Sequence, residues 1–214
     1  MKQEATGAHQ ESTGRLIYLH GFRSSSRSFK ARLLQARLTA LGLGERFIAP
    51  DLSPEPDRAI AFIQQAIGPR ADDTLVGSSL GGAYATWVAE HSGCRAVLLN
   101  PAVHPARDLA GQVGAQTGYH DGVPFEFKAS WVDQLRNYEV ARITRPERYF
   151  LIAAKGDEVL DWKEMVAAFA GARHTVIAGS DHGLSDFEDY LDDVLEFAGI
   201  GAGGRSGPGI TGRS

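Results

Sequence analysis

Short, uninterrupted apolar runs alternate with helical patterns along most of this chain, and this alternation constrains its fold most. Six runs are expected to be strands, at residues 16–19, 47–49, 74–76, 96–99, 149–153 and 175–178. Because strands buried on both faces read as continuous apolar runs, this pattern indicates a mostly parallel sheet of about six strands. Helices between such strands form right-handed crossovers and cover both faces of the sheet. The sequence therefore predicts an α/β fold arranged as a three-layer sandwich.

Helical periodicity supports this arrangement. The expected helices include residues 29–41, 59–67, 83–90 and 185–198. The last of these opens with Ser185 and Glu188, whose spacing is that of a capping box, so we expect it to begin there. Asp161, with Glu164 three residues later, is expected to cap the helix that follows it.

Residues 101–148 interrupt the alternation of strand and helix patterns, since these 48 residues contain no clear strand pattern and hold four glycines. So long a connection inside a compact domain is usually functional. We expect a lid insertion that covers the site. Its aromatic residues either offer apolar surface to a substrate or pack the lid onto the body, and the sequence leaves both open: Phe125, Phe127, Trp131 and Tyr138.

The two ends of the chain differ from its middle. Residues 1–14 are polar and lack apolar periodicity, while residues 201–214 hold six glycines and one proline. Both segments are expected to be disordered, because they have too little apolar surface to pack. A single domain over residues 15–200 remains.

Charge and hydropathy exclude several classes of partner. The net charge is −4 and no basic stripe is present, which argues against a nucleic-acid partner. The apolar runs are far shorter than the ~20 residues of a membrane-spanning helix, and no secretory signal is visible. The single cysteine, Cys94, is expected to be packed and inert, so a cytoplasmic setting fits best. The sequence does not indicate an oligomeric state.

Gly77-Ser78-Ser79-Leu80-Gly81 matches the pattern G-x-S-x-G between an expected strand and an expected helix. In a nucleophile elbow, this sharp turn holds a strained serine at the carboxyl end of the strand. Backbone crowding then requires glycine two residues before and after it. Ser79 is therefore the candidate nucleophile.

A serine nucleophile needs a base and an acid that orients the base. Among seven histidines, only His182 follows a late strand in a glycine-flanked loop. Asp157 follows the preceding strand in a Gly-Asp turn, at the same expected sheet edge, with Glu158 and Asp161 as weaker candidates. The chain order Ser79, Asp157, His182 is the order of nucleophile, acid and base in this architecture.

An oxyanion requires two hydrogen-bond donors. The backbone N–H of Leu80 follows the nucleophile at a helix N-terminus, and the second is expected from Phe22 in the loop after the first strand. His20, in the same loop, is expected to brace it rather than to act in catalysis.

These segments together resemble the YqiA-type small esterases of the α/β-hydrolase superfamily. The resemblance covers the whole domain and is carried by residues 18–28 (YLHGF and a serine-rich loop), 76–87 (VGSSLGG, then YATW), 100–105 (NPAV-P), 156–162 (GDEVLDW), 175–182 (TVI, then GSDH) and 187–190 (FEDY). It implies that Ser79, Asp157 and His182 are the triad, and that the substrate is a small acyl ester or thioester hydrolysed without a cofactor.

Two other classes of function stay open. The same fold hosts acyltransferase, lyase and cofactor-free haloperoxidase chemistry on the same triad, and it also serves as a non-catalytic binding module. Dinucleotide and phosphate-loop motifs are absent from the sequence, as is a Cys/His cluster suited to a metal.

Overall fold

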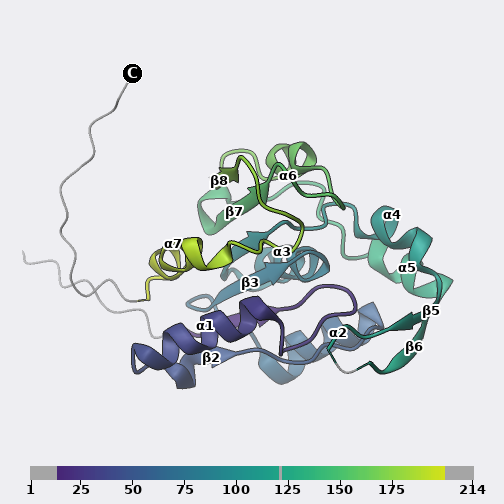
Figure 1. Ribbon diagram of the computed structural model, residues 1–214, viewed down its shortest axis with the longest axis horizontal. Helices are drawn as coiled ribbons and strands as arrows, with labels where there is room; N and C mark the ends of the chain where they lie inside the picture. The colour runs from purple at the N-terminus through teal and green to yellow at the C-terminus, as the bar shows by residue number, and fades with distance from the viewer. Residues whose placement is uncertain (1–13, 121, 201–214) are drawn as a thin grey trace, which may run out of the picture.

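A computed structural model describes residues 14–120 and 122–200. The described residues form a three-layer α/β sandwich around a six-stranded sheet whose neighbouring strands are all parallel, in the order β2-β1-β3-β4-β7-β8 (Figure 1). The strands are β1 (Leu16–Leu19), β2 (Phe47–Ile48), β3 (Thr74–Ser78), β4 (Arg95–Leu99), β7 (Tyr149–Ala154) and β8 (Arg173–Ile177). All six predicted strands are confirmed, with ends that differ by two residues or fewer.

The helices cover both faces of this sheet. They are α1 (Phe29–Ala40), α2 (Pro56–Phe62), α3 (Leu80–Ser92), α4 (Pro105–Leu109), α5 (Ala129–Arg136), α6 (Trp162–Ala168) and α7 (Leu191–Phe197). Side chains of a strand point to alternate faces. Leu16 and Tyr18 accordingly belong to the core under α1 and α7, whereas Ile17 and Leu19 belong to the core under α2, α3 and α6.

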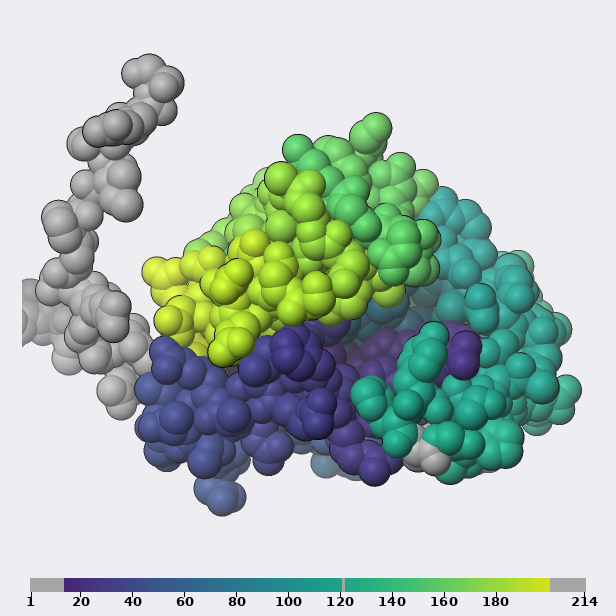
Figure 2. Space-filling model, in the orientation of Figure 1, coloured from purple at the N-terminus to yellow at the C-terminus, as the bar shows by residue number. Residues whose placement is uncertain are grey.

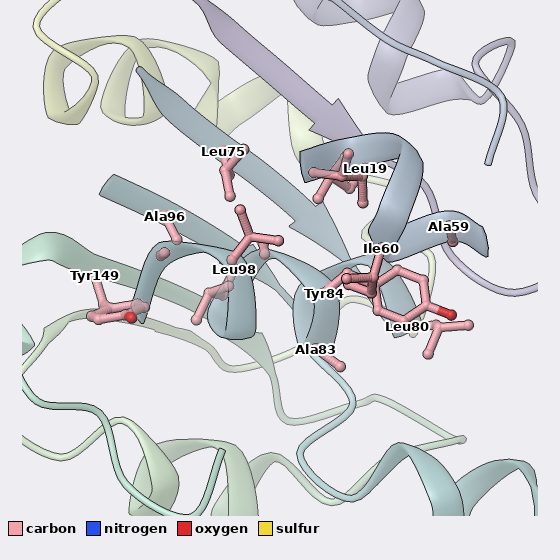
Figure 3. Packing of buried hydrophobic residues seen from close by; sticks show 14 of the residues in the cluster. Leu19, Ala59, Ile60, Leu75, Leu80, Ala83, Tyr84, Ala96, Leu98 and Tyr149 are labelled. Carbon is pink, nitrogen blue, oxygen red and sulfur yellow. The ribbon is translucent and has the colours of Figure 1, made fainter. Parts of the chain in front are cut away.

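The core beneath α3 fixes the position of the site. Leu80 and Tyr84 of α3 share one cluster of buried side chains with Leu19, Leu75 and Leu98 of the sheet (Figure 3). Because α3 begins directly after β3, this packing holds its first turn over the carboxyl end of the central strands.

Two of the predicted helix starts have different outcomes. Asp161 caps α6 as predicted, with its side chain accepting a hydrogen bond from the amide of Lys163. The prediction that a capping box at Ser185 begins the last helix is wrong. The amide of Ser185 donates to Asp181 Oδ1 at 3.0 Å, which ties Ser185 to the preceding loop. The chain then makes a 3₁₀ turn, η5 (Phe187–Tyr190), and α7 begins only at Leu191.

The insertion at 101–148 contains two strands, so the expectation that it lacks strands is wrong. β5 (Gly114–Thr117) and β6 (Pro124–Phe127) form an antiparallel pair separate from the main sheet, with α4 and α5 nearby (Figure 1). Each strand has four residues whose burial alternates, as in Phe125, Glu126 and Phe127. An alternation this short does not stand out in the sequence, unlike an uninterrupted apolar run.

Several smaller expectations concern burial and the ends of the chain. Cys94 is buried as predicted, and burial raises the pKa of its thiol to about 11. Within residues 14–120 and 122–200, no helix is long and apolar enough to cross a membrane. The segments predicted to be disordered, 1–14 and 201–214, lie outside the described residues except for Gly14.

Candidate active site

Ser79 stands at a sharp turn between β3 and α3. Its backbone has φ 53° and ψ −120°, a strained conformation for a residue with a side chain. The flanking glycines are required by close approach. A Cβ on Gly77 would lie 2.3 Å from the carbonyl oxygen of Gly81, and one on Gly81 would lie 2.0 Å from the carbonyl oxygen of Leu19. The crowding predicted for an elbow is therefore present at both positions.

His182 and Asp157 lie next to Ser79, although they come from distant parts of the sequence. His182 Nε2 is 3.1 Å from Ser79 Oγ, and His182 Nδ1 is 2.8 and 3.0 Å from the two carboxylate oxygens of Asp157. Asp157 follows β7 and His182 follows β8, so the carboxyl ends of neighbouring parallel strands bring them together. The structure thus brings the three predicted residues into one hydrogen-bonded series.

The Asp157 side chain has no exposed surface, and three groups contact its carboxyl oxygens. Its Oδ1 accepts hydrogen bonds from the amides of Val159 and Leu160, both at 2.8 Å. A carboxylate at Nδ1 favours the tautomer in which Nδ1 carries the proton and Nε2 is free to accept one from Ser79. Glu158, the weaker candidate, instead accepts a hydrogen bond from the amide of His182 at 3.0 Å.

The two amides expected to bind an oxyanion come from two segments that meet at Ser79. Leu80 opens α3, and Phe22 follows Gly21 in the loop after β1. A Cβ on Gly21 would lie 3.1 Å from Ser79 Cβ, so this loop passes directly against the serine. Among the described residues, neither amide donates a hydrogen bond to a protein acceptor. Both N–H groups therefore remain available to a ligand.

His20 braces the loop, as its position in the sequence predicts. It is 7% exposed; its Nδ1 is 2.9 Å from the carbonyl oxygen of Gly21, and its Nε2 is 2.9 Å from the amide of Leu52. These contacts require a neutral ring with the proton on Nδ1. Burial lowers the pKa of His20, which favours the same neutral form.

Asn100 is a residue of the site to which the sequence alone assigns no role. It is fully buried after β4 with φ 42°. Its Nδ2 donates to the carbonyl oxygens of Asp181 at 2.9 Å and His182 at 3.1 Å, and its Oδ1 accepts from the amide of Ala154 at 2.8 Å. Asn100 therefore fixes the backbone of the loop that carries His182. The sequence signal that could have identified Asn100 is its place directly after a strand, since asparagine tolerates a positive φ better than most residues.

Two pockets meet at the loop of residues 21–24. The triad pocket holds Ser79 and His182 and is lined by residues from β1, α1 and the insertion. Figure 2 shows the hollow between the purple N-terminal region, the teal insertion and the green C-terminal region. The second pocket, which we call the apolar pocket, has a volume of about 670 Å³ including its open mouth and is lined mainly by Phe22, Leu52, Pro54, Leu80, Tyr84, Val123 and Phe125. Both candidate oxyanion residues, Phe22 and Leu80, border the apolar pocket.

The aromatic residues of the insertion divide between the two roles left open by the sequence. Phe125 lines the apolar pocket, where its ring meets that of Phe22 edge to face at 6.0 Å. Phe127 is fully buried, and Trp131 and Tyr138 pack against the core. Most of these side chains therefore attach the insertion to the body. Among the described residues, no group of three or more His, Cys, Asp or Glu side chains is arranged to hold a metal ion.

Comparison with solved structures gives matches to α/β-hydrolase proteins. Alpha/beta hydrolase domain-containing protein 10 from mouse has a TM-score of 0.64 at 17% identity, covering 87% of this chain and 91% of that chain. Est1E from Butyrivibrio proteoclasticus, solved with ferulic acid bound, has a TM-score of 0.65 at 16% identity, covering 88% and 89%. At these identities the likeness shows the α/β-hydrolase fold.

Sequence relatives are found in Yersinia. A UPF0227 protein of Yersinia enterocolitica is 25% identical, covering 87% of this chain and 99% of its own length. A UPF0227 protein of Yersinia pseudotuberculosis is 26% identical with the same coverage. The model of the family described as "Uncharacterised protein family (UPF0227)" matches residues 15–199. The chain therefore belongs to the UPF0227 family, the YqiA-type family that its motifs indicate.

Proposed function

We propose that this protein is a serine hydrolase that cleaves small carboxylic esters or thioesters. The observation that carries the proposal is the series from Ser79 Oγ through His182 to Asp157, with contacts of 3.1 and 2.8 Å. A strained serine at an elbow, a neutral imidazole acceptor and a buried carboxylate together are the requirements for nucleophilic attack on an acyl carbonyl.

In the proposed reaction, Ser79 Oγ attacks the carbonyl carbon while His182 Nε2 takes the hydroxyl proton. The carbonyl oxygen becomes negative and accepts hydrogen bonds from the amides of Phe22 and Leu80. The bond to the leaving group then breaks, and His182 gives its proton to the departing oxygen or sulfur. Water, deprotonated by His182, then attacks the acyl carbon. The bond from this carbon to Ser79 Oγ breaks, His182 returns the proton to Oγ, and the carboxylic acid leaves.

The insertion is proposed to act as the lid of this site. Residues Gly118, Val123 and Phe125 of the β5–β6 region line the apolar pocket next to Phe22. An acyl group bound there would be covered by the insertion, and exclusion of water would strengthen the hydrogen bonds to its oxyanion. The proposed substrate is therefore a small molecule with an apolar acyl group.

Substitution of the proposed nucleophile tests the assignment. Ser79→Ala should lower kcat/KM for 4-nitrophenyl butanoate by ~10⁴-fold or more, because no other group can form the acyl-enzyme. Ser92→Ala, at the far end of the same helix, is the matched control and should keep wild-type turnover. A fluorophosphonate probe should label the wild type at Ser79 and leave Ser79→Ala unlabelled.

The same experiments separate the alternatives. Near-normal turnover by Ser79→Ala would refute the proposal. Labelling of Ser79 without hydrolysis of any ester would instead favour an acyltransferase, and halide oxidation that depends on an added organic acid would favour a haloperoxidase. Absence of both labelling and turnover would favour a binding module.

A further inference from the structure

Lys30 is a buried lysine beside the proposed catalytic residues. It lies in the first turn of α1, is 9% exposed, and lines the triad pocket together with Ser79 and His182. Its ammonium group donates a hydrogen bond to the carbonyl oxygen of Gly183, the residue that follows His182. The charge therefore lies next to the loop that carries the proposed base.

Within the described part of the chain, this ammonium is not balanced by a direct ion pair. One of its three N–H donors is used by Gly183, and Asp181 acts on it only at longer range. Burial lowers the pKa of Lys30 to about 8, while Asp181 opposes this effect. Lys30 therefore still carries its charge at pH 7. A buried charge without an opposite charge in contact is costly, so an anion that enters the pocket would be stabilised by Lys30.

The other polar groups of the triad pocket fit an anion better than a cation. Arg23 lines the same pocket, while Ser28 and Tyr18 add hydroxyl groups near α1. The one acidic side chain among the lining residues, Asp108, lies 2.8 Å from the guanidinium of Arg107, which Glu164 also contacts, so the Asp108 carboxylate is partly compensated. Two cationic side chains, Lys30 and Arg23, therefore face one partly compensated carboxylate among the lining residues.

The chemistry of the proposed reaction decides which part of a substrate enters this pocket. The leaving oxygen or sulfur must come within hydrogen-bond distance of His182 Nε2 to receive its proton. His182 and Ser79 line the triad pocket and not the apolar pocket, Leu80 lines only the apolar pocket, and Phe22 lies between the two and lines both. The acyl group is thus directed to the apolar pocket and the leaving group toward Lys30.

We propose that Lys30 binds a negatively charged substituent of the leaving group, so that the preferred substrates are apolar acyl esters or thioesters of an alcohol or thiol that bears a carboxylate or phosphate. This proposal rests on the proposed function, since it names the substrate class of that same site. Lys30 would act as a specificity-determining residue through direct contact with the substrate.

The test compares esters of the same acid that differ only in the substituent at one position of the leaving group, which is anionic in two of them and neutral in the third. The substrates are 4-carboxyphenyl butanoate and 4-phosphonophenyl butanoate, with neutral 4-carbamoylphenyl butanoate as reference, at pH 7. The measured quantity is the ratio of kcat/KM for each anionic ester to that for the neutral ester. Because Lys30→Met changes the loop contact equally for all three substrates, a change in this ratio isolates the contact with the anion. Lys163→Met, an exposed lysine outside both pockets, removes the same charge as a matched control.

We expect Lys30→Met to lower the ratio by ~10–100-fold, the value of a hydrogen bond to a charged group, while Lys163→Met leaves it unchanged. A loss of activity that is equal for all three esters would overturn the proposal and leave Lys30 as a brace of the His182 loop. An unchanged ratio in Lys30→Met would also overturn it.

A binding measurement separates this proposal from the proposed function. In the Ser79→Ala background, calorimetry should show tighter binding of an intact anionic ester than of the neutral one, and Lys30→Met should abolish the difference. Such a result without turnover by the wild type would refute the esterase assignment and support the anion site. Turnover by the wild type with no charge preference in binding would support the esterase assignment and refute the anion site.

Discussion

Asn100 allows a direct test of how the loop that carries His182 is held. In Asn100→Ala, the amide of Ala154 loses its acceptor inside the core, and the carbonyl oxygens of Asp181 and His182 lose their donor. An orphaned buried N–H costs roughly 1–3 kcal/mol, and alanine at φ 42° adds about 1 kcal/mol. We therefore expect the free energy of unfolding to fall by ~3 kcal/mol.

The same substitution should affect catalysis more than substrate binding. Asn100 touches neither pocket, so KM should change little. The loop would lose two of the contacts that keep His182 Nε2 at 3.1 Å from Ser79 Oγ, and a displacement of about 1 Å can cost ~100-fold in rate. We expect kcat for 4-nitrophenyl butanoate to fall by ~10–100-fold.

Two further variants make the result specific. Asn100→Asp keeps the acceptor for Ala154 but replaces the donor with an oxygen facing two carbonyl groups, so it should also lower kcat. Thr74→Val is the matched control, because the buried Thr74 hydroxyl at the opposite end of β3 has no hydrogen-bond partner among the described residues. Urea unfolding and steady-state kinetics measure both effects. An Asn100→Ala protein with kcat within twofold of wild type and a stability loss under ~1 kcal/mol would refute this reasoning.

Three other predictions concern packing and protonation. Gly81→Ala should destabilise the fold by ~3 kcal/mol or prevent folding, because the new Cβ would lie 2.0 Å from a backbone oxygen of β1; Gly111→Ala, with open space around it, should be neutral in the same urea titration. His20 should make the protein less stable as the pH falls below about 6.5, because burial lowers its folded pKa and only the unfolded chain then takes up the proton; the drop in urea midpoint between pH 7.5 and 5 should be smaller in His20→Gln. Lys30 should also make the folded protein more stable as the pH rises, but over a higher pH range. With a folded pKa of about 8 and an unfolded value of 10.5, wild-type stability should rise by ~1–2 kcal/mol relative to Lys30→Met between pH 7 and 9.5, and a constant difference would contradict the assigned burial of charge.

The features that the sequence predicts correctly are those with a local cause. The strands β1, β3 and β7 are buried on both faces, so their burial is visible in a run of four to six consecutive residues. Gly77, Ser79 and Gly81 are constrained by one turn, and the proximity of Ser79 to Asp157 and His182 follows from strand ends that share one edge of a parallel sheet. The β5–β6 pair has no such local signal, because one face of each short strand is exposed.

The residues that sequence reasoning missed act through contacts between distant segments. Asn100 and Gly183 are separated by most of two β–α units, yet Asn100 and Lys30 together bind the carbonyl oxygens of three consecutive residues, 181–183. The positive φ of Asn100 is a local reason for an asparagine, but it does not reveal these contacts, and nothing local requires a lysine at position 30. The position of Lys30 is nevertheless visible in the sequence pattern. Lys30 is four residues before Leu34 and eight before Leu38, so it occupies the buried stripe of α1, where an apolar residue is expected. A charge in the apolar stripe of a helix is costly unless polar groups or a ligand contact it. The mismatch between a lysine and its apolar stripe is therefore a signal in the amino-acid pattern itself, and it indicates that Lys30 has a polar contact, which the structure supplies at the carbonyl oxygen of Gly183.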